Sequence, residues 1–168
     1  MTIPAHALLA YAVYKPIPRL NWKKAVWWAI FPDFVWAIPL AIYLILTKSA
    51  VPTDYSNGPL WMYHLYASTH SFIISFSIIG VVYILKRKFP FEMLAWPLMH
   101  ILMDLPGHTH FQTPFLYPLS HYSIRGLFSW TDPVFAVASY VVPIVILAVT
   151  YIVKREIRSR TQTPFRSV

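Results

Sequence analysis

Histidines and carboxylates that can bind a metal ion are concentrated in one short stretch of this chain, residues 100–110 (HILMDLPGHTH). His100 and Asp104 are four residues apart, so on a helix their side chains share one face. A Pro-Gly pair then ends the helix, and His108 and His110 follow directly. Imidazole and carboxylate suit divalent transition metals, and we therefore interpret this stretch as one wall of a metal site.

Three earlier apolar segments each contribute a group of the same kind. His6 lies near the N-terminus, Asp33 follows a proline, and His70 sits in a Ser-Thr-His-Ser run. Together with residues of the 100–110 stretch, the predicted metal ligands are His6, Asp33, His70, His100, Asp104 and His108. His110 is the alternative to His108, which we prefer because it lies four residues after Asp104.

The composition indicates a membrane protein, since 57% of the residues are hydrophobic and only 12% are charged, about half the charged fraction of soluble domains. The N-terminus shows no cleavable signal pattern. The net charge of +8 comes from short basic clusters beside apolar runs. Such clusters are typical of membrane anchoring, whereas nucleic-acid binding would need a basic face on a soluble fold. The chain has no cysteine, which excludes disulfides and thiolate ligands.

The apolar runs predict an all-α fold, namely a polytopic membrane bundle of four spans plus an N-terminal half-helix in one transmembrane domain, residues 1–168. The half-helix is too short to cross a hydrocarbon core of about 30 Å. The 15 prolines, several of them inside apolar runs, predict kinked or broken helices. We expect the half-helix at 3–14, spans at about 25–47, 61–85, 91–106 and 131–153, and a basic tail at 154–168.

The basic clusters also predict the orientation. By the positive-inside rule, the clusters at 15–24, 86–88 and 154–166 face the cytoplasm, and the loops at 48–60 and 107–130 face outward. The expected location is the plasma (inner) membrane, crossed several times, with the C-terminus in the cytoplasm. We expect membrane lipid as the partner and no nucleic acid.

The predicted ligands lie at similar depths in this topology. At a helical rise of about 1.5 Å per residue from the cytoplasmic clusters, His6 and Asp33 lie about 14 Å deep, and His100 about 18 Å. His70 and Asp104 both lie about 24 Å deep, and the histidines after Asp104 come at the outer mouth. A lone charge at such depth costs about 2.5–3.5 kcal/mol, and no Lys or Arg of the spans lies there. A divalent cation shared by these residues accounts for their presence at this depth.

Several interpretations of these residues stay open. Imidazole and carboxylate suit Zn²⁺, with Mn²⁺ or Fe²⁺ as alternatives. Six ligands exceed the four of tetrahedral zinc, so either two ions bind or some residues orient ligand histidines. His100 and Asp104 alone would suit a metal-free hydrogen bond, and His64 and His121 near the interfaces are interpreted as packing residues. The whole cluster would also suit a metal-ion or proton transporter, or a structural protein whose polar groups join helices.

The motifs also resemble a known family, the small membrane-bound metal-dependent hydrolases described as LexA-regulated, and are more distantly similar to zinc-dependent phospholipase C. The resemblance covers residues 1 to about 130. It rests on His6, Pro32-Asp33, Thr69-His70-Ser71, His100-x-x-x-Asp104, His108 and the proline-rich run 113–120. The family often has His-Arg-Gly before Thr-His-Ser. Here His64 stands one residue further away, and the arginine is missing.

Together the residues and the resemblance predict a membrane-embedded metal-dependent hydrolase of a lipid or lipid-linked ester or phosphoester. Metal would lower the pKa of a bound water and polarise the substrate oxygen. Asp33 or Asp104 would act as catalytic general base. Arg125, on the outer loop, would meet an anionic headgroup.

Overall fold

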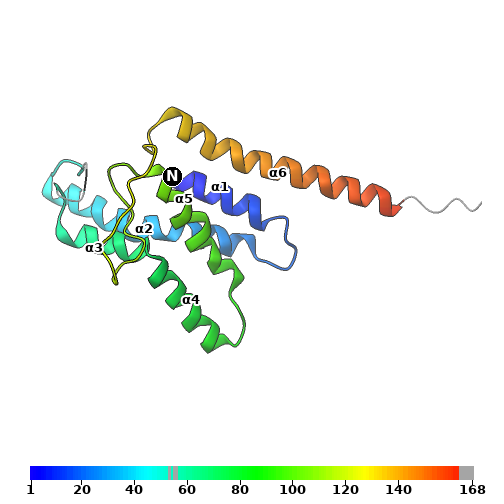
Figure 1. The fold of residues 1–168 in the computed structure, drawn as a ribbon, viewed down its shortest axis with the longest axis horizontal. Helices are drawn as coiled ribbons and strands as arrows, with labels where there is room; N and C mark the ends of the chain where they lie inside the picture. Colours follow the sequence, from blue (N-terminus) through cyan, green and yellow to red (C-terminus); the bar gives the residue numbers. More distant parts are fainter. Residues whose placement is uncertain (53, 55–56, 163–168) are drawn as a thin grey trace, which may run out of the picture.

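The computed structural model describes residues 1–52, 54 and 57–162, and within these residues the chain is helical and forms no strand (Figure 1). The only pairing of strand type there is an isolated bridge between Thr113 and Ile124. The all-α prediction is confirmed. The elements are α1 Ile3–Tyr14, α2 Trp22–Thr47, α3 Leu60–Thr69, α4 Phe72–Lys86, η2 Phe91–Leu94, η3 Trp96–Ile101, α5 Leu102–Asp104, η4 Leu105–Gly107 and α6 Pro133–Gln162.

Two helices, α2 and α6, are long and apolar enough to cross a membrane. Helices α3 and α4 make a third candidate if they are counted as one broken span, with a bend of 54° between them. The segment expected as a span at 91–106 is instead a chain of short helical turns, η2 to η4. The structure therefore supports membrane association through two or three apolar helical spans.

Helix α1 lies between α2 and α6 and packs against both (Figure 1). Its inner side joins an apolar core in which alanine predominates, formed by Ala10, Tyr14, Ala25, Ala29 and Ala95. Small side chains let helix backbones approach closely. This close approach brings the start of α1 and the middle of α2 against η3.

The expected continuous span at 61–85 is broken at His70 and Ser71, where α3 ends and α4 begins. The Ser71 hydroxyl caps α4 by accepting the Ile74 N–H at 3.2 Å, as serine commonly does at helix starts. It also donates to the Tyr117 carbonyl, and the Phe72 N–H donates to the Phe115 carbonyl at 2.9 Å. The proline-rich loop therefore satisfies the backbone groups that the break exposes.

The segment between α4 and α6 is irregular around His100 and Asp104. It contains a π-helical turn at Trp96–Ile101, which includes Pro97 and His100. Such turns are rare and are frequent at functional sites. The Trp96 indole N–H donates to the Thr69 carbonyl at 2.7 Å, so this turn is fixed to the end of α3.

Helix α6 begins as the sequence suggests but ends later. The Asp132 carboxylate caps it, accepting the Val134 and Phe135 N–H groups at 2.9 and 3.2 Å. The helix continues through the expected boundary at residue 153 to Gln162, so the first part of the predicted tail is helical. The rest of that tail, residues 163–168, lies outside the described residues.

Candidate metal centre

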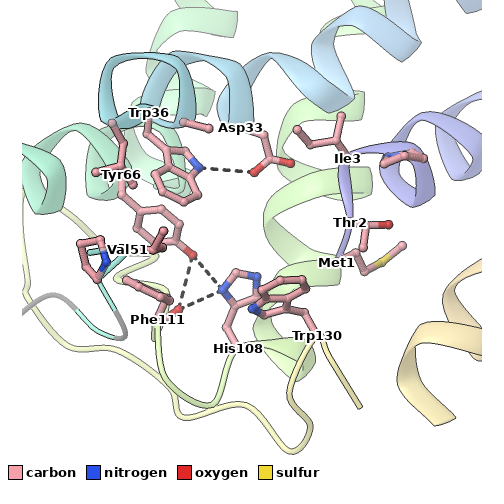
Figure 2. A pocket seen from close by; sticks show the side chains of 14 residues that line it. Met1, Thr2, Ile3, Asp33, Trp36, Val51, Tyr66, His108, Phe111 and Trp130 are labelled. Carbon is pink, nitrogen blue, oxygen red and sulfur yellow. Dashed lines mark hydrogen bonds between the residues drawn. The ribbon is translucent and has the colours of Figure 1, made fainter. Parts of the chain in front are cut away.

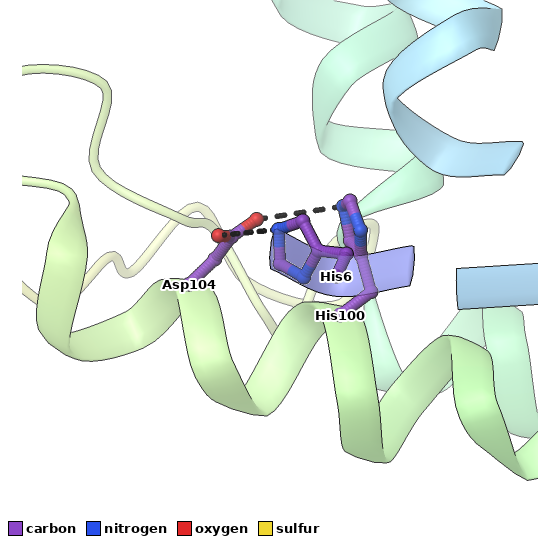
Figure 3. A group of neighbouring side chains, drawn as sticks. All are labelled: His6, His100 and Asp104. Atoms are coloured by element: carbon purple, nitrogen blue, oxygen red, sulfur yellow. Dashed lines mark ion pairs between the residues drawn. The ribbon is translucent and has the colours of Figure 1, made fainter. Parts of the chain in front are cut away.

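Six side chains from separate parts of the chain meet in the interior. His6 comes from α1, Asp33 from α2 and His70 from the end of α3, and the others are His100 in η3, Asp104 in α5 and His108 after η4. His6, His70 and His100 are completely buried, and Asp104 is 1% exposed. Figure 3 shows His6, His100 and Asp104 directed toward one another. The predicted ligands are therefore neighbours in space.

Each of the four histidines is held through its Nδ1 atom by a backbone carbonyl. His6 Nδ1 donates to Met99 at 2.9 Å, His100 Nδ1 to Ala29 at 2.7 Å, and His70 Nδ1 to Tyr66 at 3.0 Å. His108 Nδ1 donates to Phe111 at 3.0 Å. A carbonyl oxygen can only accept, so Nδ1 carries the proton and a neutral ring presents an Nε2 lone pair. Outer contacts of this kind fix the tautomer and orientation of metal-binding histidines.

The four Nε2 atoms point at the Asp104 carboxylate. Oδ1 lies 3.1 Å from His6 Nε2 and 3.3 Å from His108 Nε2. Oδ2 lies 3.4 Å from His100 Nε2 and 3.6 Å from His70 Nε2. With Nδ1 protonated in each ring, the site consists of acceptor atoms that face one another and could hold a cation.

Asp33 borders the same cluster from α2. Its Oδ1 atom lies 3.9 Å from His100 Nε2 and accepts a hydrogen bond from the Trp36 indole at 3.4 Å. Ala29, one turn earlier on the same face of α2, supplies the carbonyl that holds His100. One turn of α2 thus positions both the carboxylate and a histidine from another segment.

The position of His108 depends on the loop before α6, which crosses it closely. The Gly126 N–H donates to the His108 carbonyl at 3.0 Å, and the Phe128 N–H donates to the Pro106 carbonyl at 2.9 Å. A Cβ atom at position 126 would lie 2.6 Å from the His108 backbone nitrogen. Only glycine allows this approach.

The residues present fit a metal ion. His6 Nε2, Asp33 Oδ2 and His108 Nε2 are buried without a hydrogen-bond partner, although buried polar atoms are normally paired. The contact of His6 Nε2 with Asp104 is close but joins two acceptors. The Met1 amino group forms an ion pair with Asp104 Oδ1 and leaves these three atoms unpaired. Two triads could each hold an ion with ligand atoms within 4.8 Å: His6, His100 and Asp104, and Asp33, His70 and His100.

The other polar residues considered from the sequence lie elsewhere. His110 is exposed and borders a separate pocket together with His121. His64 is exposed, and its Nδ1 contacts the Tyr117 hydroxyl at 3.3 Å. Arg125 is exposed in the loop between η4 and α6. Of the two histidines after Asp104, His108 is thus the one beside the carboxylate.

Two aromatic residues of the site were not predicted from the sequence. The ring of Tyr66 stacks on His70 with centroids 3.8 Å apart, and its hydroxyl lies 3.2 Å from His108 Nδ1 and from Thr113 Oγ1. Trp36 holds Asp33. Helical spacing was the available signal, because Tyr66 lies four residues before His70 and Trp36 three after Asp33. This spacing was not used because aromatic residues are common in membrane belts, which already explained their number.

An apolar pocket of about 420 Å³ opens beside the cluster (Figure 2). Asp33 contributes a carboxylate to its wall and His108 an imidazole. Its other lining residues are Met1, Thr2, Ile3, Pro4, Trp36, Ala37, Leu40, Val51, Pro52, Tyr66, Phe111 and Trp130. A molecule in this pocket would touch the cluster at Asp33 and His108.

Fold and site together define a helical, membrane-type protein with a buried histidine–carboxylate cluster that could hold a metal ion. No protein-family model, curated protein or solved structure matches the chain.

Proposed function

We propose that this protein is a membrane-embedded, metal-dependent hydrolase of a lipid or lipid-linked ester or phosphoester. One observation carries the proposal: four imidazole Nε2 atoms, fixed through Nδ1, converge with two carboxylates beside an apolar pocket. Catalytic metal sites combine such a ligand set with an opening toward substrate. The resemblance in motif order to membrane-bound metal-dependent hydrolases supports the same reaction class.

A bound divalent ion, with Zn²⁺ preferred to Mn²⁺ or Fe²⁺ for this donor set, would supply an activated water and polarise the substrate oxygen. His6, His70, His100, His108 and Asp104 would hold it. Asp104 has imidazole nitrogens near both carboxylate oxygens, and we assign it to ligation.

Asp33 is the better candidate for the general base of the two carboxylates named from the sequence. It lies in the pocket wall, and its Oδ2 atom has no hydrogen-bond partner. The Trp36 indole holds the other oxygen. Asp33 would then take a proton from the attacking water, while Trp36 keeps its carboxylate directed at the pocket.

The pocket supports a lipid as the substrate class. Among the residues that the structure describes, its wall is formed mainly by aliphatic and aromatic side chains and contains no Lys or Arg. An acyl or isoprenoid chain would fit such a surface, with the ester or phosphoester group at Asp33 and His108. Arg125 is proposed to meet an anionic headgroup from the outer loop.

The proposed topology has four crossings and a cytoplasmic C-terminus in the plasma (inner) membrane. Helices α2 and α6 are two crossings, and the bent pair α3–α4 is a third. The short helical segments at 91–107 would complete the fourth while α1 enters as a half-helix. Irregular backbone is tolerated at membrane depth where it is buried in protein, and Trp96, Pro97, His100 and Ile101 are buried.

Metal-ion or proton transport is the alternative use of this cluster. Transport requires a path from the cluster to both sides of the membrane. Toward the basic loop after α1, the cluster is bordered by the apolar core that contains Ala10, Tyr14 and Ala25. This core favours hydrolysis over transport.

The test is hydrolysis by the full chain, purified and reconstituted in a bilayer, with a panel of glycerophospholipids and isoprenoid phosphoesters. We expect hydrolysis of at least one lipid, its loss with chelator and its return with Zn²⁺ or Mn²⁺. Asp33→Asn should lower turnover about 100-fold or more, whereas the matched exposed variant His110→Ala should not. Metal-loaded protein that hydrolyses no lipid in the panel would overturn the proposal.

A further inference from the structure

The two oxygens of Asp104 face different histidines. Oδ1 is near His6 and His108, whereas Oδ2 is near His70 and His100. Figure 3 shows this division for His6 and His100, which lie opposite separate carboxylate oxygens. A carboxylate arranged in this way can bind one ion with each oxygen.

The distances from the Asp104 oxygens to the histidines of each group are close to the spacing of ligands around an ion. In a tetrahedral zinc site with bonds of about 2.0–2.1 Å, neighbouring ligand atoms lie about 3.3–3.4 Å apart. His6 and His108 lie 3.1 and 3.3 Å from Oδ1. On the other side, His100 and His70 lie 3.4 and 3.6 Å from Oδ2, and their Nε2 atoms are 2.9 Å apart.

The number of ligands favours two ions over one. The cluster holds four imidazoles and two carboxylates, more than the four ligands that zinc usually takes. Asp33 Oδ1 lies 3.9 Å from His100 Nε2. Through this oxygen Asp33 would add a fourth ligand to the His70–His100 group and keep Oδ2 for the proton transfer of the proposed function. His6, His108 and Oδ1 form a group of three, and an ion bound there would displace the Met1 amino group from Oδ1.

The pocket touches both groups. Asp33 belongs to one group and His108 to the other, and both side chains line the pocket wall. A phosphoester or ester group placed there would contact both halves of the site. Two-metal sites of phosphatases and nucleases hold their substrates across ions about 3.5–4 Å apart.

We infer that Asp104 bridges two divalent cations, one held with His6 and His108 and the other with His70, His100 and Asp33. The inference rests on the metal site of the proposed function and specifies its number of ions. It differs from the two overlapping triads of the site because His100 serves one ion only. A neutral imidazole has a single free lone pair once Nδ1 is protonated.

The experiment measures metal stoichiometry and ion–ion coupling in the full-length protein. Protein freed of metal by chelator is titrated with Zn²⁺, and separately with Mn²⁺ under electron paramagnetic resonance. We expect two Zn²⁺ per chain and a spectrum from exchange-coupled Mn²⁺ pairs. His6→Ala and His70→Ala should each bind one ion without coupling, and His110→Ala should keep two. Circular dichroism shows whether each variant is folded.

One Zn²⁺ per wild-type chain, or two uncoupled Mn²⁺ ions, would overturn the inference, and the wild-type result decides without any variant. This failure is distinct from failure of the proposed function. Lipid hydrolysis with one bound ion would refute only the bridged pair. Two coupled ions in a protein that hydrolyses no lipid would support the bridged pair and refute the hydrolase.

Discussion

His70 Nε2 and His100 Nε2 lie 2.9 Å apart in the interior of the protein. Each ring already donates its Nδ1 proton to a backbone carbonyl, of Tyr66 and of Ala29 respectively. As neutral rings, the two residues therefore direct lone pairs at each other, which is repulsive without a cation between them. A protein that fixes two lone pairs so closely is organised to share a proton or a metal ion. The four imidazoles and two carboxylates together favour the metal.

Metal removal should lower the thermal stability of the protein. An ion present at about 100 times its Kd stabilises the folded state by about 2.7 kcal/mol, which corresponds to about 5–10 °C in Tm for a chain of this size. We expect chelator to lower the Tm by this amount and Zn²⁺ to restore it. His100→Ala should reduce the response and His110→Ala should keep it. A wild-type Tm that is the same with and without chelator would contradict a stabilising ion.

Tyr66→Phe should weaken metal binding while the fold is kept. The hydroxyl of Tyr66 lies 3.2 Å from His108 Nδ1 and from Thr113 Oγ1, whereas its ring stacks on His70. Phenylalanine removes only the hydroxyl. Outer groups that orient ligand histidines are worth about 10–100-fold in metal affinity or activity. We expect a loss of about 10-fold in Zn²⁺ affinity by competitive titration.

Tyr63→Phe is the matched control for Tyr66→Phe. The Tyr63 hydroxyl contacts His121 Nδ1 at 2.9 Å, in the separate pocket that His110 also lines. This variant should bind Zn²⁺ as the wild type does. Equal affinities for both variants would show that the Tyr66 hydroxyl has no role in orienting His108.

Ala37→Trp should obstruct the apolar pocket without removing metal. Ala37 lines the pocket on α2, so an indole would fill much of its volume of about 420 Å³. We expect an increase of about 10-fold or more in KM for long-chain lipid substrates, with unchanged metal content. Ile38→Trp, on the exposed face of the same helix, should have little effect. Unchanged kinetics in Ala37→Trp would place the substrate elsewhere.

The absence of cysteine from the native sequence allows a direct test of topology. A single cysteine replacing Ser49, in the loop after α2, should react with a membrane-impermeant maleimide added to intact cells. One replacing Ser159, near the end of α6, should react only after the membrane is opened. Labelling of Ser159→Cys in intact cells would contradict a cytoplasmic C-terminus.

Much of the candidate site could be located from the sequence because the number of residues between a basic cluster and a ligand sets the depth of that ligand in a membrane span. His6, Asp33 and His70 come from separate helices, yet counting from the basic clusters placed them at similar depths. The same constraint identified α2 and α6, because long apolar runs have few alternatives to a helix. The all-α class followed from these runs.

The details that give the site its chemistry depend on contacts between residues that are far apart in the sequence. The break at His70 is stabilised by the Phe115 and Tyr117 carbonyls, and no local signal predicts which loop will supply them. The π-helical turn that carries His100 is fixed by the bond from Trp96 to Thr69. The length of α6 beyond residue 153 was missed because basic residues were interpreted as the end of the span, although they are also good helix formers.

Metal content of the purified full-length protein tests the central claim most directly. Three proteins are purified in detergent and analysed for metal by mass spectrometry: wild type, His100→Ala and His110→Ala. The two variants both remove a histidine, one inside the cluster and one outside it. We predict bound transition metal in wild type and His110→Ala, and a loss of at least half of it in His100→Ala. Full metal content in His100→Ala, or no metal in wild type after incubation with Zn²⁺ and removal of excess, would contradict a metal centre at this cluster.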